Sequence, residues 1–223
     1  MTTALVVGRR RKGRPIGATV DDAAARLEAA GWTVHSRLVE KKREVRKETR
    51  KAVAAGVDVV VAVGGDGAVL QVIQKLAETK VPLGIVPMGT GNLLATNLGI
   101  PKPVDEAIAV VLGQRQRVID LGHVKTGGKG GKDEVFAVAC GVGFDADVMK
   151  ATPKSRKRRL GKLAYFASAF AQRRKVGNVQ HEITVTARRR RAVRRRSSSR
   201  TSEAWASASS RTSRSSPTTV CST

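Results

Sequence analysis

The sequence is poor in acidic residues, aromatic side chains and cysteine. It has 18 Asp and Glu against 42 Lys and Arg, so its formal net charge is +24. Only 3% of its 223 residues are aromatic, so aliphatic side chains must supply most of any core. Two cysteines make no disulfide framework. No apolar run reaches the roughly 18 residues of a membrane span, and the N-terminal charges follow a very short apolar run, which argues against an integral membrane protein or a Sec substrate.

Charge and apolar content divide the chain near residue 186. Residues 188–223 hold ten arginines and one acid, Glu203. Segment 187–223 is low in apolar content and has no helix or strand periodicity, so we expect a disordered Arg/Ser-rich tail. Such a tail is typical of a segment that binds nucleic acid or anionic lipid, unless a reading-frame error produced it.

The first part of the chain alternates β-branched runs with helical patterns, which predicts an α/β domain over 1–125 with a largely parallel sheet. The run VDVVVAV is apolar nearly throughout, as in a strand covered on both faces. Asp21 or Asp22 is a plausible cap of the first helix. The expected strands are 4–7, 32–39, 57–63 and 81–87, and the expected helices lie within 20–30, 41–55 and 68–79.

After residue 115 the pattern changes to strands alone. We expect strands at 118–124, 133–143 and 179–186, the first two separated by the glycine-rich TGGKGGK turn. This change predicts a partial, β-rich second domain over 126–186.

The strand at 57–63 runs into Gly64, Gly65, Asp66 and Gly67 and then directly into a helix. Glycines let the backbone approach an anion closely, and a helix N-terminus offers free N–H groups to phosphate. Asp66 is a candidate for handling Mg²⁺ or for polarising a hydroxyl. The alternative is a tight turn with Asp66 as an ordinary helix cap.

A second loop repeats the arrangement, because the strand at 81–87 leads into Gly89, Thr90, Gly91, Asn92 and a helix. In a parallel sheet both loops open at the carboxyl edge, where ligands bind. We therefore expect the pair to bind a ligand. Thr90 and Asn92 would hydrogen-bond a nucleotide, or would satisfy the turn itself.

These motifs resemble those of the diacylglycerol kinase catalytic domain family, which includes bacterial diacylglycerol kinases, YegS-like lipid kinases and sphingosine kinases. The similar segments are GGDGA at 64–68, PMGTGNLLATNLGIP at 87–101, VIDLGHV, FAVACGVGFDADV and LGKLAYF. NAD kinases share the GGDG turn but lack the second block. The resemblance implies an ATP-dependent, Mg²⁺-requiring kinase that phosphorylates a lipid hydroxyl. It also implies an NAD kinase/diacylglycerol kinase-like α/β fold, followed here by the start of an incomplete β-sandwich domain.

The resemblance also implies site residues and partners. It places the two glycine loops at the nucleotide, Asp66 in catalysis and Asp145 near the substrate, although Asp145 could equally be an ordinary surface carboxylate. Arg158 and Arg159, in the basic run that follows, could reach phosphate. The resemblance does not identify which residues would bind the metal ion. The expected partners are ATP and a lipid, with peripheral contact at the inner face of the membrane from a cytoplasmic location, no specific nucleic acid, and a homodimer allowed. The nucleotide-binding residues are Gly64, Gly65, Asp66, Gly67, Gly89, Thr90, Gly91 and Asn92.

Three departures from the family stand out. Ala68 replaces a threonine, which removes a hydroxyl from the first loop. GRRRKGR at 8–14 replaces the usual Asn-Pro-x-Ser-Gly turn, where Arg9 to Lys12 could meet phosphate or form a solvated basic loop. The late Asp-Gly-Glu segment that the family uses to supply a general base is not found.

The tail becomes family-like when its codons are shifted back by one nucleotide. With G or C at most free third positions, 217–223 then reads Asp-Asp-Gly-Leu-Leu-Asp, and 196–209 reads as a strand with Asn-x-Gly. We therefore expect a one-nucleotide lesion near the codons for 180–187. Three function classes stay open: an ATP-dependent lipid kinase, an inactive nucleotide-binding fragment and a basic nucleic-acid-binding protein.

Overall fold

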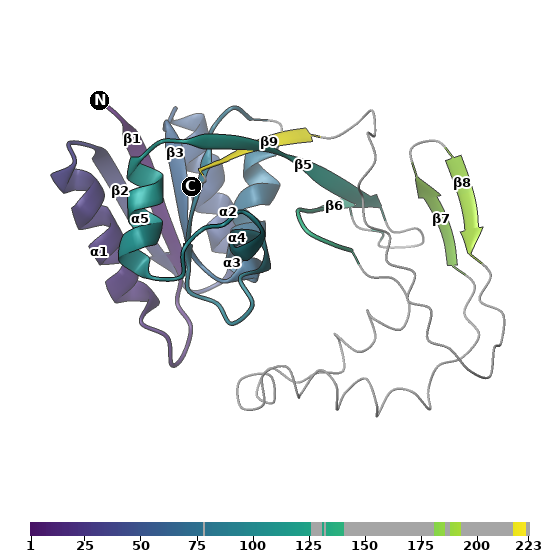
Figure 1. Ribbon diagram of the computed structural model, residues 1–223, viewed down its shortest axis with the longest axis horizontal. Helices are drawn as coiled ribbons and strands as arrows, with labels where there is room; N and C mark the ends of the chain where they lie inside the picture. The colour runs from purple at the N-terminus through teal and green to yellow at the C-terminus, as the bar shows by residue number, and fades with distance from the viewer. Residues whose placement is uncertain are drawn as a thin grey trace. The chain divides into compact units, whose positions relative to one another are not determined.

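The computed structural model describes residues 1–77, 79–125, 131, 133–140, 181–185, 188–192 and 216–221 (Figure 1). It divides into two compact units. The first is Met1–Val138 together with Ser215–Thr223, and the second is Ala139–Arg214.

Four parallel strands form the centre of the first unit, as the sequence predicted. Their order is β2-β1-β3-β4, and β1 pairs with both β2 and β3 in parallel register. Every residue of β3 is buried, which explains why this stretch of sequence is apolar without alternation. The strands are β1 (Thr3–Arg9), β2 (Thr33–Val39), β3 (Val59–Gly64) and β4 (Leu83–Pro87).

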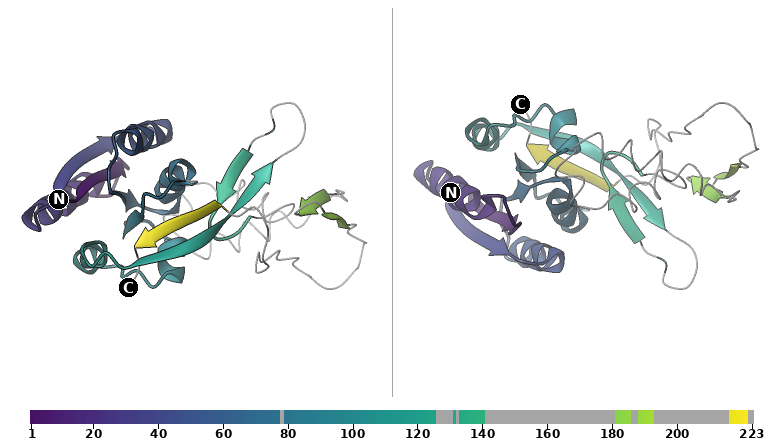
Figure 2. Two further views of the ribbon diagram at one scale, coloured as in Figure 1. Left: turned by 90° about the horizontal axis from the view of Figure 1, so that it is seen from above. Right: turned by 90° about the horizontal axis from the view of Figure 1, so that it is seen from below.

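Helices cover both faces of this sheet (Figure 2). On one face α1 packs on β1, β2 and α5; on the other α2 packs on β1 and α3, and α3 packs on β3. No helix within the described ranges is long and apolar enough to cross a membrane. The helices are α1 (Ile16–Ala29), α2 (Lys42–Ala54), α3 (Asp66–Leu76), α4 (Leu93–Asn97) and α5 (Val104–Leu112).

The predicted cap of α1 is wrong, because the helix begins before Asp21 and Asp22. Pro15 is the N-cap, and its fixed φ suits the first turn of a helix. The buried face of the helix begins with Ile16, so burial of this side chain favours a helix that starts there. Asp22 instead accepts a hydrogen bond from Arg26 one turn later, at 2.9 Å. Helix α5 was not among the predicted helices.

Three further strands extend the sheet in the order β4-β9-β5-β6. Strand β5 (Gln116–Lys125) contains the expected strand at 118–124 and pairs antiparallel with β6 (Asp133–Phe136), which is shorter than expected. Strand β9 (Ser216–Cys221) pairs in parallel with β4 and antiparallel with β5. In the second unit, β7 (His181–Val185) pairs antiparallel with β8 (Arg188–Ala192).

Strands β8 and β9 lie within the segment 187–223 that we expected to be disordered. Both are held by backbone pairing with a neighbouring strand, which requires no apolar periodicity in the sequence. The strand at 179–186 is present as β7. Most of the expected second domain lies outside the described residues.

Candidate functional site

The two glycine loops lie side by side at the carboxyl edge of the parallel sheet. One follows β3 and the other follows β4, and these strands are neighbours with Gly64 opposite Pro87. The N–H of Met88 donates a hydrogen bond of 2.8 Å to the Gly64 carbonyl, so the pairing continues past the last residue of β4. The sheet therefore brings together two segments that are separate in the sequence.

Gly65 and Gly89 are the point of contact between the loops. A Cβ atom on Gly65 would lie 2.8 Å from the Gly89 Cα, and one on Gly89 would lie 2.6 Å from the Gly65 Cα. Such distances are shorter than real side chains allow. Glycine is thus required at both positions by close backbone approach.

Asn92 holds the second loop in shape. Its Oδ1 accepts a hydrogen bond from the Gly89 N–H at 2.8 Å, and its Nδ2 donates to the Gly89 carbonyl at 3.1 Å. The residue is buried and has a left-handed backbone with φ of 50°. Of the two sequence-based interpretations of Asn92, the geometry fits the one in which its amide satisfies the turn.

Asp66 lies where both loops meet. It is the first residue of α3, with Gly65 as the N-cap, and it is exposed. A Cβ atom on Gly91 would lie 3.1 Å from the Asp66 Oδ2, so this carboxylate is next to the second loop. The exposed N-terminal turn of α3 offers a positive dipole end to an anion beside that carboxylate.

The basic loop 8–14 also reaches this edge. From the sequence, Arg9 to Lys12 were candidates for contact with phosphate, and Arg14 was not singled out. Arg14 donates a hydrogen bond from Nη2 to the Thr90 Oγ1 at 3.2 Å. Both side chains are exposed. Loop composition gave the only signal for this contact, because the two residues are 76 positions apart.

Ala68 occupies the position at which the resemblance implies a threonine. Its Cβ lies 2.8 Å from where a Cβ on Gly64 would be, so the methyl group covers the Gly64 backbone. The Ala68 N–H donates to the Gly65 carbonyl at 2.8 Å, within the first turn of α3. The substitution leaves the helix start intact and removes a hydroxyl from the loop.

The remaining predicted site residues, Asp145, Arg158 and Arg159, lie outside the described residues. Within the part of the chain that the structure describes, no group of three or more His, Cys, Asp or Glu side chains is placed to hold a metal ion. Asp66 is the carboxylate that the structure brings to the glycine loops.

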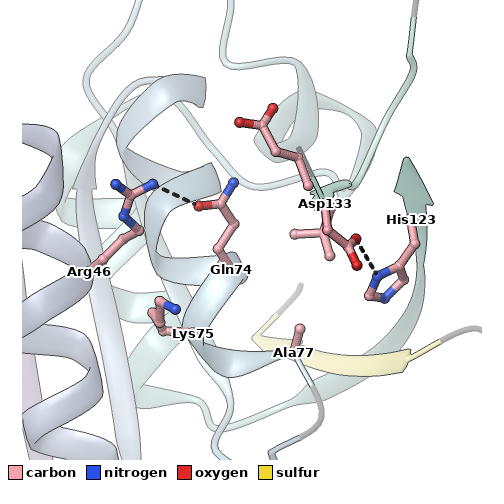
Figure 3. A pocket seen from close by; sticks show the side chains of 8 residues that line it. Arg46, Gln74, Lys75, Ala77, His123 and Asp133 are labelled. Carbon is pink, nitrogen blue, oxygen red and sulfur yellow. Dashed lines mark hydrogen bonds and ion pairs between the residues drawn. The ribbon is translucent and has the colours of Figure 1, made fainter. Parts of the chain in front are cut away.

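A separate hollow of about 470 Å³ lies at the other end of α3 (Figure 3). Gln74, Lys75 and Ala77 line it from the C-terminal end of that helix. The Gln74 Oε1 accepts a hydrogen bond of 3.3 Å from the Arg46 Nη1. The His123 Nδ1 lies 3.9 Å from the Asp133 Oδ1 across the β5–β6 pair. This hollow contains none of the predicted site residues.

Residues 4–124 match the family described as the diacylglycerol kinase catalytic domain. A diacylglycerol kinase of Mycobacterium tuberculosis is 34% identical over 151 residues, which cover 67% of this chain and 48% of that protein. The protein named probable lipid kinase YegS-like of Chromohalobacter salexigens is 35% identical over 150 residues, covering 66% of this chain and 46% of that protein. The chain thus spans about half the length of the curated relatives it matches.

The fold is similar to that of a solved diacylglycerol kinase from Bacillus anthracis. The TM-score is 0.60 at 20% sequence identity, and the similarity covers 86% of this chain and 61% of the other. This similarity confirms the predicted α/β fold. The family match spans more than half of the 223 residues and contains both glycine loops. The chain therefore belongs to the family of proteins with a diacylglycerol kinase catalytic domain.

Proposed function

We propose that this protein is an ATP-dependent lipid kinase that transfers the γ-phosphoryl group to a lipid hydroxyl. The contact between the two glycine loops carries the proposal, because it joins an exposed helix start, close-packed backbone and the Asp66 carboxylate at one edge. That edge is where open parallel sheets bind their ligands.

The loops have the properties that a triphosphate requires. Glycine at 65, 67, 89 and 91 leaves backbone accessible, and the N-terminus of α3 favours negative charge. Exposed Arg14 adds a cation next to Thr90. Asp66 suits Mg²⁺, which proteins usually hold through one or two carboxylates together with substrate phosphates. When bound, Mg²⁺ would neutralise charge on the phosphates.

In the proposed reaction the lipid hydroxyl oxygen forms a bond to the γ-phosphorus. The bond between that phosphorus and the β–γ bridging oxygen breaks, and ADP leaves with the electron pair. The hydroxyl proton passes to solvent water, because the late Asp-Gly-Glu segment that the resemblance implies as the source of a general base is not found in this sequence. Positioning and charge stabilisation dominate such a transfer, so the task of these loops is to fix the phosphates.

The test is Mg²⁺-dependent transfer of labelled γ-phosphate to lipid. Diacylglycerol, a sphingoid base and phosphatidylglycerol are offered separately, which also identifies the acceptor. Asp66→Asn should reduce transfer by at least about a hundredfold. Asp21→Asn is the matched control, because Asp21 is an exposed carboxylate on α1, and it should leave transfer unchanged.

The second candidate is a nucleotide-binding chain without activity, which the loss of a hydroxyl at Ala68 in the first glycine loop favours. Under that alternative, ATP would bind and Asp66→Asn would weaken its binding, yet no lipid would be phosphorylated. Transfer to any of the three lipids rejects the alternative. If Asp66→Asn left the affinity for ATP and Mg²⁺ unchanged, the assignment of Asp66 to the nucleotide site would be wrong for both candidate functions.

A further inference from the structure

The hollow at the C-terminal end of α3 has opposite charges on its two sides. Arg46 of α2 and Gln74 and Lys75 of α3 form one side, which we call the cationic wall. Asp133 and Glu134 of β6 form the acidic wall. Figure 3 shows Arg46 and Gln74 on the side opposite Asp133. The volume of about 470 Å³ lies within the range of pockets that bind small molecules.

The cationic wall carries charge that its surroundings leave without a counter-ion. Arg46 and Lys75 are half-buried, and partial loss of hydration is unfavourable for a cation that has no anionic partner. Within the part of the chain that the structure describes, neither forms an ion pair. Lys75 suits the negative end of the α3 dipole, but Arg46 lies inside α2 and gains nothing from a helix end. An external anion would neutralise both side chains.

The donors of the cationic wall fit a phosphate group. The hydrogen bond from the Arg46 Nη1 to the Gln74 Oε1 orients the guanidinium, which has five N–H donors in all. Lys75 offers an ammonium group from the neighbouring helix. A phosphomonoester carries a charge of about −1.5 to −2 at pH 7 and three acceptor oxygens, so it matches two cations better than a singly charged anion does. The cationic wall therefore favours a phosphomonoester.

The acidic wall requires a second group on the same ligand. Asp133 is partly neutralised, because its carboxylate lies 3.4 Å from the Lys125 Nζ. Glu134 is exposed and, among the described residues, forms no ion pair. The two walls do not pair with each other either, although their charges are opposite. A ligand with an ammonium group beside its phosphate would interact with both walls at once.

We propose that this hollow binds a small phosphorylated amine, with the phosphate on the cationic wall and the ammonium group on the acidic wall. The site is separate from the glycine loops, since Asp66 and Lys75 lie about 14 Å apart along the axis of α3. The inference thus goes beyond the proposed function and does not depend on it.

The test is isothermal titration calorimetry of the full 223-residue chain at low salt, without nucleotide or Mg²⁺. The probe is O-phosphoethanolamine, which should bind with a Kd at or below about 1 mM. Inorganic phosphate and ethanolamine are its two halves, and each should bind at least about tenfold more weakly. Glycerophosphoethanolamine is a phosphodiester with the same amine and the chemistry of a lipid headgroup. It should also bind about tenfold more weakly, because its phosphate has a single negative charge.

Variants of the cationic wall test the phosphate position. Arg46→Gln combined with Lys75→Gln should weaken O-phosphoethanolamine binding about a hundredfold, because each charge-assisted hydrogen bond contributes about tenfold. The matched control combines Arg43→Gln with Lys47→Gln, which remove two exposed cations of α2 that do not line the hollow. It should bind within about twofold of wild type, and circular dichroism melting should be the same for both double variants.

A variant of the acidic wall tests the ammonium position. Glu134→Gln should weaken O-phosphoethanolamine binding about fivefold and should not weaken the binding of inorganic phosphate. Glu28→Gln removes an exposed carboxylate of α1 and should leave the binding of both ligands unchanged.

Several results would overturn the inference. Equal binding of inorganic phosphate and O-phosphoethanolamine would show that the acidic wall plays no part. Equal or tighter binding of glycerophosphoethanolamine would replace the phosphomonoester by a lipid headgroup. Equal losses in the two double variants, or no binding to wild type at about 10 mM probe, would show that the hollow is not the site. Failure here would leave the proposed kinase standing, and absence of phosphoryl transfer would leave this site standing, because the titration contains no nucleotide.

Discussion

The contact between the glycine loops makes a sharp prediction for Gly89→Ala. The new Cβ would lie 2.5 Å from the Asn92 Oδ1 and 2.6 Å from the Gly65 Cα. Ordinary contacts are 3.4–4 Å, so the loops must separate by roughly 1 Å. The neighbours that must move are backbone and a side chain already fixed by two hydrogen bonds.

The magnitude follows from two costs. Overpacking of a close contact costs about 1–3 kcal/mol. Weakening the two Asn92 hydrogen bonds adds about 0.5–1.5 kcal/mol for each bond that is lost. We expect the free energy of unfolding to fall by about 2–4 kcal/mol, which corresponds to about 5–15 °C in Tm for a unit of this size.

Thermal unfolding followed by circular dichroism, with and without ATP, measures both consequences. The Tm should fall in Gly89→Ala, and the increase in Tm on adding ATP should disappear, because the loops no longer meet. Gly67→Ala is the control, since its Cβ would meet nothing within 4 Å and would lie inside α3, where alanine is favoured over glycine by up to about 1 kcal/mol. A Gly89→Ala protein that melts within 1–2 °C (roughly the experimental scatter) of wild type, or a Gly67→Ala protein that loses as much stability, would refute the loop contact.

Three further predictions concern the second loop, helix α2 and the reading frame. In urea unfolding, Asn92→Gly should destabilise the protein by about 1 kcal/mol less than Asn92→Ala. Both variants lose the side-chain hydrogen bonds, but only alanine is strained at φ of 50°. The reverse order would contradict the left-handed turn. Hydrogen bonds from the N–H groups of Lys41 and then Glu40 lower the pKa of Glu44, so its contribution to stability is present at neutral pH and is lost as the pH falls through that lowered pKa. Glu44→Gln should therefore melt below wild type at pH 7, and the difference should shrink between about pH 5 and pH 3; a constant difference would show that the charge is not involved. Resequencing the gene should reveal a one-nucleotide lesion near codons 180–187, and an unaltered frame together with a cooperatively folding 223-residue product would show that the tail is genuine.

Local patterns predicted the parallel strands because burial on both faces leaves an uninterrupted apolar run, as in β3. The glycine loops were equally readable, since strand, glycine and helix follow one another directly in the sequence. The contact between Gly65 and Gly89 could not be predicted from the sequence, because it depends on the register of β3 against β4. Sequence pattern also left open whether Asn92 faces a ligand or its own turn, a choice that requires the backbone of Gly89.

Other features were hidden for different physical reasons. Arg14 and Thr90 meet only through the fold, so no local pattern relates them. The start of α1 was placed too late because aspartate is a common cap, whereas here Pro15 begins the helix. Strand β9 was missed since its hydrogen bonds to β4 and β5 involve the backbone alone, and backbone pairing leaves little trace in composition.

The place of β9 imposes an order on biosynthesis. Strand β5 is the next strand after β4 along the chain, yet β9, made of residues 216–221, separates them in the sheet. A ribosome that has finished β5 needs roughly 5–20 s to make the intervening residues. During that interval strands β1 to β4 can assemble. The edges of β4 and β5 that later pair with β9 stay unpaired until β9 has been made. Chaperones that shield strand edges should therefore matter most for the nascent chain after β5 emerges and before β9 does.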